Sequence, residues 1–116
     1  MAKRNVDLIT EAFADVMSNR RKYVLNKPDG SLLKELYFPP LTRFDRMQAQ
    51  AATGTDDALA ISTRLLCQIA QNEDGTKAFA SADAENLQRF LPESVLNELE
   101  LFMMDIKVDI NTAKKE

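Results

Sequence analysis

The stretch from residue 56 to residue 105 constrains the fold most, because it reads as three consecutive helices joined by short turns. Residues 56–72 predict the first of these helices, which has the widest apolar face in the chain. That face repeats at helical spacing and consists of Ala58, Leu59, Ile61, Leu65, Leu66, Ile69 and Ala70. We therefore expect this helix to form the centre of the core.

Two further helices are expected after the acidic turn at residues 73–75. Ser81 is suited to cap a short helix over residues 81–90. Pro92 is suited to the first position of a last helix, where its missing N–H group has no cost. The residues expected to face inward are Leu87, Phe90 and Leu91, followed in the last helix by Val95, Leu99, Phe102 and Ile106.

The N-terminal part combines helices with one β-hairpin. Residues 5–19 predict a helix with an apolar stripe formed by Val6, Ile9, Phe13, Val16 and Met17. Residues 22–38 predict the hairpin, because two β-prone runs flank the turn-forming residues from Asn26 to Gly30. Thr42 then opens a mostly polar helix with capping-box spacing, which Gly54 ends and whose apolar side is Phe44, Met47 and Ala51.

Together these patterns predict an α+β, mainly α fold: a small helical domain of about five helices with one β-hairpin near the N-terminal third. We expect a single domain over residues 1–116, since a chain of this length can support one core without metal or disulfide staples. Within it, the helical part is predicted to cover residues 42–107. The polar residues 108–116 are expected to form a frayed tail.

The composition argues against an enzyme. The chain contains no histidine, which removes the commonest general base and the commonest metal ligand. Its single cysteine, Cys67, lies in an apolar stretch, so we interpret it as a buried structural thiol. The pair Asp56–Asp57 and the turn at 72–75 lack the further ligands that a metal site needs. We therefore expect no catalytic residue, no metal and no cofactor.

The charge pattern limits the possible partners. A net charge of −3 disfavours nucleic acid as a partner, and we interpret the basic triplet at residues 20–22 as a solvated helix end. No apolar run approaches the roughly 20 residues of a membrane span. The start of the sequence has no apolar stretch long enough for a signal peptide. We expect a cytoplasmic protein without a membrane partner.

The order of the motifs resembles that of the tail assembly chaperones of long-tailed bacteriophages. The likeness covers roughly residues 22–106, and the segments that carry it are Leu36–Thr42, Arg43–Arg46, Glu73–Phe79, Ser81–Ala84 and Leu91–Pro92. Two features depart from the family's pattern. Many relatives carry a tryptophan near the first strand, and this chain has none; it also has a double proline before the polar helix.

The resemblance implies a non-enzymatic assembly chaperone. Such proteins bind the tape measure protein, keep it soluble in the host cytoplasm and present it for assembly with the tail tube protein. They usually leave the finished particle. An alternative is a structural virion component, such as a connector or tail-completion subunit. A small DNA-binding regulator is disfavoured, because the helix over residues 81–90 carries two acids and one arginine and would repel phosphate.

The last helix has a second apolar stripe on the side opposite its core-facing residues. We predict that this stripe, formed by Leu101, Met104 and Val108, binds a partner, because an ordinary surface helix would be polar there. Methionine suits a surface that must accept several different helical segments. Two alternatives remain open: the hairpin or the first helix covers the stripe, or the stripe is a self-association contact.

Overall fold

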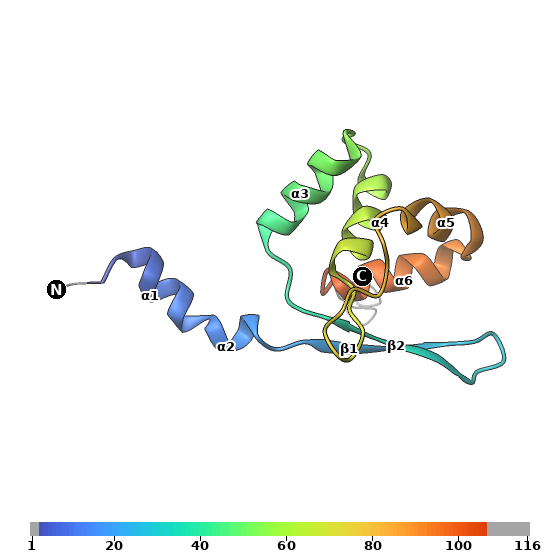
Figure 1. Cartoon of the computed structure of the whole chain (residues 1–116), viewed down its shortest axis with the longest axis horizontal. Helices are drawn as coiled ribbons and strands as arrows, with labels where there is room; N and C mark the ends of the chain where they lie inside the picture. Colours follow the sequence, from blue (N-terminus) through green and yellow to red (C-terminus); the bar gives the residue numbers. More distant parts are fainter. Residues whose placement is uncertain (1–2, 107–116) are drawn as a thin grey trace, which may run out of the picture.

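A computed structural model describes residues 3–106, and its elements confirm the α+β, mainly α fold (Figure 1). An antiparallel hairpin lies along one side of a body formed by four helices, while the first two helices extend away from that body. The principal extents are 59 × 42 × 32 Å. The elements are α1 (Asn5–Ala12), α2 (Ala14–Met17), β1 (Arg21–Asn26), β2 (Leu32–Phe38), α3 (Arg43–Thr53), α4 (Ala58–Ile69), α5 (Asp83–Phe90) and α6 (Glu93–Met103).

The hairpin forms where the sequence predicts it. β1 and β2 pair antiparallel, with Arg21 opposite Phe38 at the open end. At the turn, the Lys27 N–H donates to the Ser31 carbonyl over 2.7 Å, and the Gly30 N–H donates to the Lys27 carbonyl over 2.9 Å. Gly30 has a φ of +91°, a region in which a residue with a Cβ is strained. The predicted turn residues therefore have the conformations that the turn requires.

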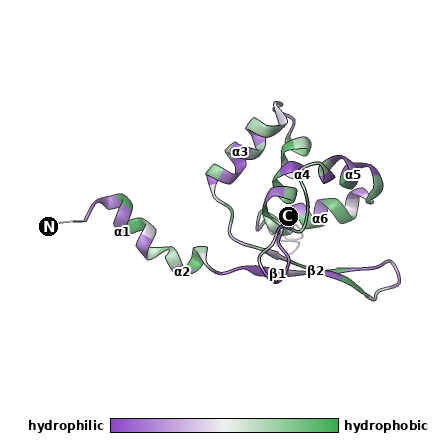
Figure 2. Ribbon diagram, in the orientation of Figure 1, coloured by the Kyte–Doolittle hydropathy of each residue, from purple (hydrophilic) through white to green (hydrophobic). Residues whose placement is uncertain are grey.

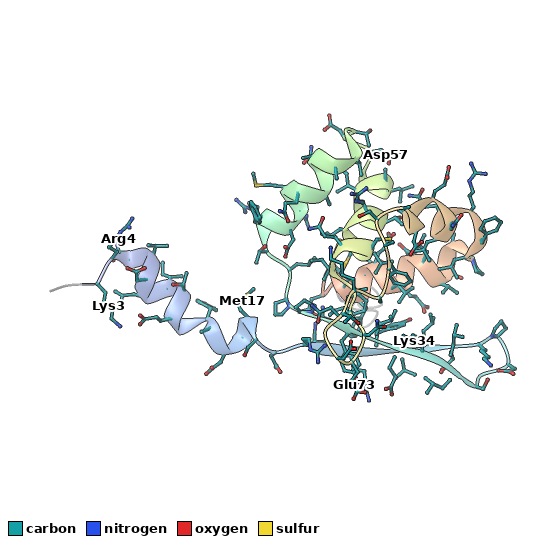
Figure 3. The ribbon with its side chains drawn as sticks, in the orientation of Figure 1. Lys3, Arg4, Met17, Lys34, Asp57 and Glu73 are labelled. Carbon is teal, nitrogen blue, oxygen red and sulfur yellow. The ribbon has the colours of Figure 1, made fainter. Side chains whose placement is uncertain are left out.

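A short extended segment after α4 also pairs with the hairpin, and the sequence pattern did not predict it. Tyr37 and Gln71 exchange two backbone hydrogen bonds of 2.9 Å, and Gln71 also pairs with Lys77. The intervening acidic turn, which contains Glu73, lies beside the hairpin (Figure 3). This pairing attaches the end of α4 to β2. It supports a two-stranded ribbon that would be only marginally stable alone.

The core lies where β2 meets α4 and α6. β2 buries the alternate residues Leu36 and Phe38, as the two-residue period of a strand requires. Phe102 packs edge-to-face against Tyr23 and Phe38, with ring centroids 5.0 and 5.6 Å apart. The expected central position of the helix over residues 56–72 is confirmed by α4, although α4 is shorter than predicted and Leu59 of its predicted apolar face is 66% exposed. The residues that surround these side chains in the core are Ala49, Leu65, Leu66, Ile69, Ala70, Leu99 and Met103.

The single helix predicted over residues 5–19 is divided in the structure. α1 ends at Ala12 and α2 begins at Ala14, because Phe13 between them has φ −103° and ψ 6°, outside the helical region. The predicted end of that helix also differs, since α2 stops at Met17. The interruption explains why the structure has six helices in the described range where about five were expected.

The starts of the last two helices differ from the prediction. Ser81 does not cap α5; the Asp83 carboxylate accepts a hydrogen bond of 2.8 Å from the Ala80 N–H at that helix start. Pro92 is the residue before α6 rather than its first helical residue. In both cases the helix begins one or two residues later than predicted. The Asp83 side chain in the first turn marks the start of α5, and the fixed φ angle of Pro92 marks the start of α6.

Two side chains expected to face inward are exposed. Phe90 is 77% exposed, because the short helix α5 contacts the core through Leu87 and Leu91 instead. Ile106 is 52% exposed, because α6 ends at Met103 and the chain turns at Asp105, which has a φ of +56°. Both predictions were therefore wrong: Phe90 lies in a helix whose core contact is made by other residues, and Ile106 lies beyond the end of its helix. The predicted tail over residues 108–116 lies outside the described residues.

Candidate partner-binding surface

The first exposed apolar surface is an arm formed by α1 and α2, which extends from the body with Lys3 and Arg4 at its far end (Figures 1 and 3). In Figure 2 the ribbon of this arm carries hydrophobic segments interspersed with hydrophilic ones. Five of its apolar side chains are here called the arm stripe. They are between 42% and 59% exposed and comprise Val6, Ile9, Phe13, Val16 and Met17. An amphipathic helix whose apolar side is left exposed by the described chain is expected to have a partner.

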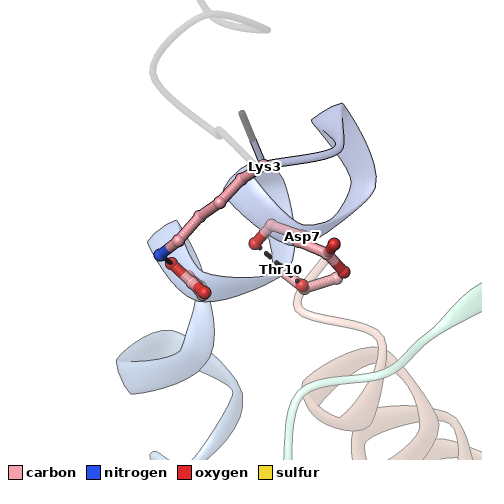
Figure 4. A network of polar contacts seen from close by, with 4 residues as sticks. Lys3, Asp7 and Thr10 are labelled. Carbon is pink, nitrogen blue, oxygen red and sulfur yellow. Dashed lines mark hydrogen bonds and ion pairs between the residues drawn. The ribbon is translucent and has the colours of Figure 1, made fainter. Parts of the chain in front are cut away.

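Polar contacts between residues close together in the sequence link the start of the arm to the rest of α1 (Figure 4). The Lys3 ammonium lies 2.8 Å from the Glu11 carboxylate, and the Thr10 hydroxyl donates to the Asp7 carbonyl over 3.1 Å. Both partners of the ion pair are more than half exposed, so it contributes little stability. The arm is therefore a helix formed by local interactions, with the arm stripe available on its other side.

The second exposed apolar surface is on α3. Thr42 and Asp45 form the predicted capping box at its start, and Gly54 ends it in the left-handed conformation. The predicted apolar side, however, points away from the body, with Phe44 63% and Met47 59% exposed. The two helices α3 and α4 approach each other through Ala49, which is fully buried. Phe44 and Met47, here called the α3 stripe, are therefore an apolar surface without a function in the core.

Met104, one of the predicted partner-binding residues, lies between the elements that carry these two stripes. It is half-buried and lines one hollow with Val16 of α2 and Leu41, and another with Ile61 of α4 and Ile106. The structure therefore brings Met104 close to the arm and to the start of α3. Leu101 is also half-buried, and Val108 lies outside the described residues. Partner binding at these three residues stays a prediction.

The basic triplet at residues 20–22 has a different role from the solvated helix end that was predicted. Arg20 donates to the Glu73 carbonyl over 2.9 Å and stacks on the Tyr37 ring, 4.9 Å from its centroid. Arg21 donates to the Met103 carbonyl over 3.0 Å and lies 4.5 Å from the Phe102 ring centroid. These arginines belong to the connection between the arm and the body. They fasten β1 to the turn after α4 and to the end of α6.

The described residues offer no arrangement for metal or nucleophilic chemistry. No group of three or more histidine, cysteine, aspartate or glutamate side chains within residues 3–106 could hold a metal ion. The Asp57 carboxylate caps α4 by accepting from the Leu59 N–H over 3.0 Å, and Asp56 accepts from the Gln50 amide over 2.9 Å. Burial, with a smaller contribution from Asp83, raises the pKa of the Cys67 thiol to about 11. This opposes thiolate formation near neutral pH.

No helix over the described range is both long and apolar enough to cross a membrane. The arm is amphipathic, but its two helices contain eight and four residues. A spanning helix needs about 20 apolar residues.

The elements define a class of fold: a small, mainly helical α+β domain in which a hairpin supports a body of four helices and precedes them in the chain. Within this class, the structure is similar to the solved structure of the bacteriophage HK97 tail assembly chaperone. The TM-score is 0.50 and the sequence identity is 12%, over 86% of this chain and 97% of that chain. At the level of the fold, this likeness confirms the resemblance found in the sequence.

The likeness is one of structure rather than of sequence. No family model matches this sequence, and no curated protein matches it. At 12% identity, the shared features are the order and packing of the helices and strands. Function must therefore be argued from the surface of this chain as well as from its fold.

Proposed function

We propose that this protein is a phage tail assembly chaperone without catalytic activity. It binds the tape measure protein in the host cytoplasm, keeps that protein soluble and presents it for assembly with the tail tube protein. The fold likeness to the HK97 tail assembly chaperone supports the general kind of role. The exposed arm stripe and α3 stripe support the mode of action, because both are helical apolar surfaces of the kind that bind amphipathic helices.

The observation that carries the proposal is the outward direction of α3. An ordinary surface helix turns its apolar side toward the core and its polar side toward water. α3 departs from this order, since only the small Ala49 is buried while the large apolar side chains Phe44 and Met47 face solvent. Such an arrangement costs solubility unless another molecule covers the stripe. A long helical protein that must not aggregate before tail assembly needs its own apolar surface covered. Binding to the α3 stripe would cover both surfaces.

The test is co-purification with the tape measure protein after co-expression. The double variant Phe44→Glu with Met47→Glu is expected to fold like the unchanged chain, because both side chains are more than half exposed. We expect it to retain at least tenfold less tape measure protein. The matched control is Leu32→Glu with Leu33→Glu at the hairpin tip, where both side chains are similarly exposed. Equal co-purification by the two double variants would contradict the proposal.

The predicted residues at the end of α6 are tested by a second pair of changes, Leu101→Glu with Met104→Glu. Both side chains are half-buried, so circular dichroism must accompany the binding measurement. A folded variant that no longer co-purifies the tape measure protein supports a partner face at α6. An unfolded variant assigns these residues to the core, and a folded variant that still binds places the contact elsewhere.

Mass spectrometry of purified particles separates the proposed chaperone from a structural virion component. A chaperone is present in infected cells and depleted from finished particles, whereas a connector or tail-completion subunit stays in a fixed number of copies. Retention of this chain at a fixed copy number would contradict the chaperone proposal even if tape measure binding were found.

A further inference from the structure

A hollow of about 260 Å³ lies between α4, α5 and α6, away from the two stripes already described. Its walls combine three leucines with the carboxylates of Glu93 and Glu100, which no ion pair of the described chain uses. The residues that line it are Leu59, Thr63, Gln88, Leu91, Glu93, Leu96, Asn97 and Glu100. A hollow of this size is small for an organic cofactor and suits one long side chain.

Glu100 is the unusual member of this set, because it is a charged residue that is only 6% exposed. One oxygen of its carboxyl group, Oε2, lies 2.7 Å from the Thr63 hydroxyl. Every fully buried side-chain polar atom in residues 3–106 has a hydrogen-bond partner. Since no hydrogen bond from the described residues reaches the other oxygen, Oε1 is not fully buried among them and retains access to open space. The open space that Glu100 lines is this hollow.

The chemistry of the walls defines the group that fits. An acidic group would be repelled by Glu100 and by Glu93 at the same hollow. A purely apolar group would cover Glu100 Oε1 without giving it a hydrogen-bond partner, which is costly for a buried polar atom. An aliphatic stem that ends in a cation satisfies both the leucines and the carboxylate. Lysine and arginine side chains have this form.

The rim of the hollow indicates that such a side chain belongs to a larger molecule. Leu59 lines the hollow and is 66% exposed, and Phe90 of the neighbouring helix α5 is 77% exposed. A free amine in the hollow would leave both side chains in water. An amphipathic helix would cover them with its apolar residues while one basic residue entered the hollow.

We propose that the hollow between α4, α5 and α6 binds the lysine or arginine side chain of a helical partner segment, with its charge at Glu100 and its methylene groups against Leu59, Leu91 and Leu96. The inference deepens the proposed function and rests on it, because the helical partner is then the tape measure protein. It adds a selection rule. Helical segments of the partner that carry a basic residue beside their apolar stripe are bound in preference to those that do not.

The experiment uses two synthetic helical peptides as probes. Both carry leucines at i, i+3, i+4 and i+7, and they differ at one central position, which is lysine in one and norleucine in the other. Fluorescence anisotropy at pH 7 gives the dissociation constants with the full chain. We expect the lysine peptide to bind about tenfold more tightly or better, as for a charge pair at a desolvated interface. Equal affinities would overturn the proposal.

Three variants test whether the preference for the lysine peptide arises at this hollow. Glu100→Gln should remove it, while Glu73→Gln, with the same change of net charge on an exposed turn, should keep it. Asn97→Lys places a cation at the wall of the hollow on an exposed position and should also remove it. This variant keeps the test decisive if Glu100→Gln fails to fold. A preference for lysine that survives in folded Asn97→Lys or Glu100→Gln would overturn the assignment to this hollow.

The peptide assay does not depend on the tape measure protein. Loss of the lysine preference in Glu100→Gln, together with no tape measure binding by the unchanged chain, would retain the hollow as a site and reject the proposed function. Tape measure binding that is unaffected by all three variants would retain the function and reject the hollow as its contact.

Discussion

Thr63 and Glu100 are joined by a hydrogen bond of 2.7 Å between α4 and α6, at the edge of the core. The Thr63 hydroxyl also lies 3.1 Å from the Leu59 carbonyl. A hydroxyl has one proton, so it donates either to the carbonyl or to the carboxylate. When Glu100 is ionised, the hydroxyl donates to it. When Glu100 is protonated, the carboxylic acid donates to the hydroxyl, which donates to the carbonyl.

Glu100→Gln is expected to stabilise the protein near neutral pH. Burial raises the pKa of the Glu100 carboxyl in the folded state, and the hydrogen bond from Thr63 only partly offsets this. The unfolded chain therefore binds fewer protons at this site than the folded chain. The contribution of Glu100 is then fully present below the ordinary glutamate pKa of about 4.3 and is lost as the pH rises through the raised pKa. Glutamine does not titrate and avoids this loss.

The measurement is the melting temperature of both proteins as a function of pH. The difference in favour of Glu100→Gln should grow as the pH rises and should disappear below about pH 4. Glu73→Gln, on an exposed turn, serves as the control and should show no such trend. A difference that is independent of pH would mean that packing rather than ionisation distinguishes glutamine from glutamate at this position.

Phe38→Ala and Phe90→Ala are expected to differ strongly, although the sequence predicted that Phe90 would face the core. Phe38 is fully buried and packs edge-to-face against Phe102, so its removal should lower the free energy of unfolding by about 3–5 kcal/mol. Phe90 is 77% exposed, and its removal should change that free energy by less than about 0.5 kcal/mol. Urea denaturation followed by circular dichroism measures both. Similar losses would show that α5 packs differently.

The elements that local patterns define were predicted from the sequence. The hairpin, the capping box at Thr42 and the left-handed Gly54 depend on residues close together in the chain, and the structure confirms all three. The centre of the core was also predicted, because the helix that became α4 has the widest apolar face in the sequence. These features require no knowledge of which element packs against which.

The direction of α3 and the pairing of Gln71 could not be predicted in this way. An apolar side at helical spacing shows that a helix is amphipathic, but not whether a core or a partner covers it. Ala49 is too small to stand out in such a pattern, yet it is the residue that packs inward. Gln71 pairs with Tyr37 through backbone atoms, which no side-chain pattern reports.

The same reason limits what the sequence says about the candidate surface, and partner binding at Leu101, Met104 and Val108 stays a prediction. Met104 was selected because it is apolar where a surface helix would be polar. The structure adds the arm stripe and the α3 stripe on either side of it. The hollow at Glu100 gave no sequence signal, since one glutamate in a helix is ordinary. Glu100 is distinguished only by the structure, in which it is buried and forms no ion pair with a described residue.

Cys67 is expected to be inert in the folded protein. Its thiol is buried and has a pKa raised to about 11, so little thiolate exists at pH 8. Iodoacetamide at that pH should modify the folded chain far more slowly than the chain in guanidinium chloride, as mass spectrometry would show. Equally rapid modification in both conditions would contradict the buried structural role.

Gly30→Val should destabilise the hairpin through the backbone alone. Gly30 has a φ of +91°, and a Cβ at this position would meet no atom within 4 Å. The cost is therefore conformational strain rather than a clash, and we expect a loss of roughly 1 kcal/mol or more. Thermal melting should show a lower midpoint with unchanged helical circular dichroism below the transition. Gly30→Asn, which tolerates a positive φ better, should show a smaller decrease.

Ile9→Glu with Phe13→Glu tests whether the arm is independent of the body. The two side chains are 59% and 56% exposed, and no residue of α1 or α2 is buried. The melting temperature should therefore stay within about 2 °C of that of the unchanged chain, as for surface changes of less than about 0.5 kcal/mol. If the arm stripe contacts the tape measure protein, co-purification should fall at the same time. Ala12→Glu, which adds one charge in the same helix, is the control for a general effect of acidity. A large decrease in melting temperature would instead show that the arm folds against the body in solution.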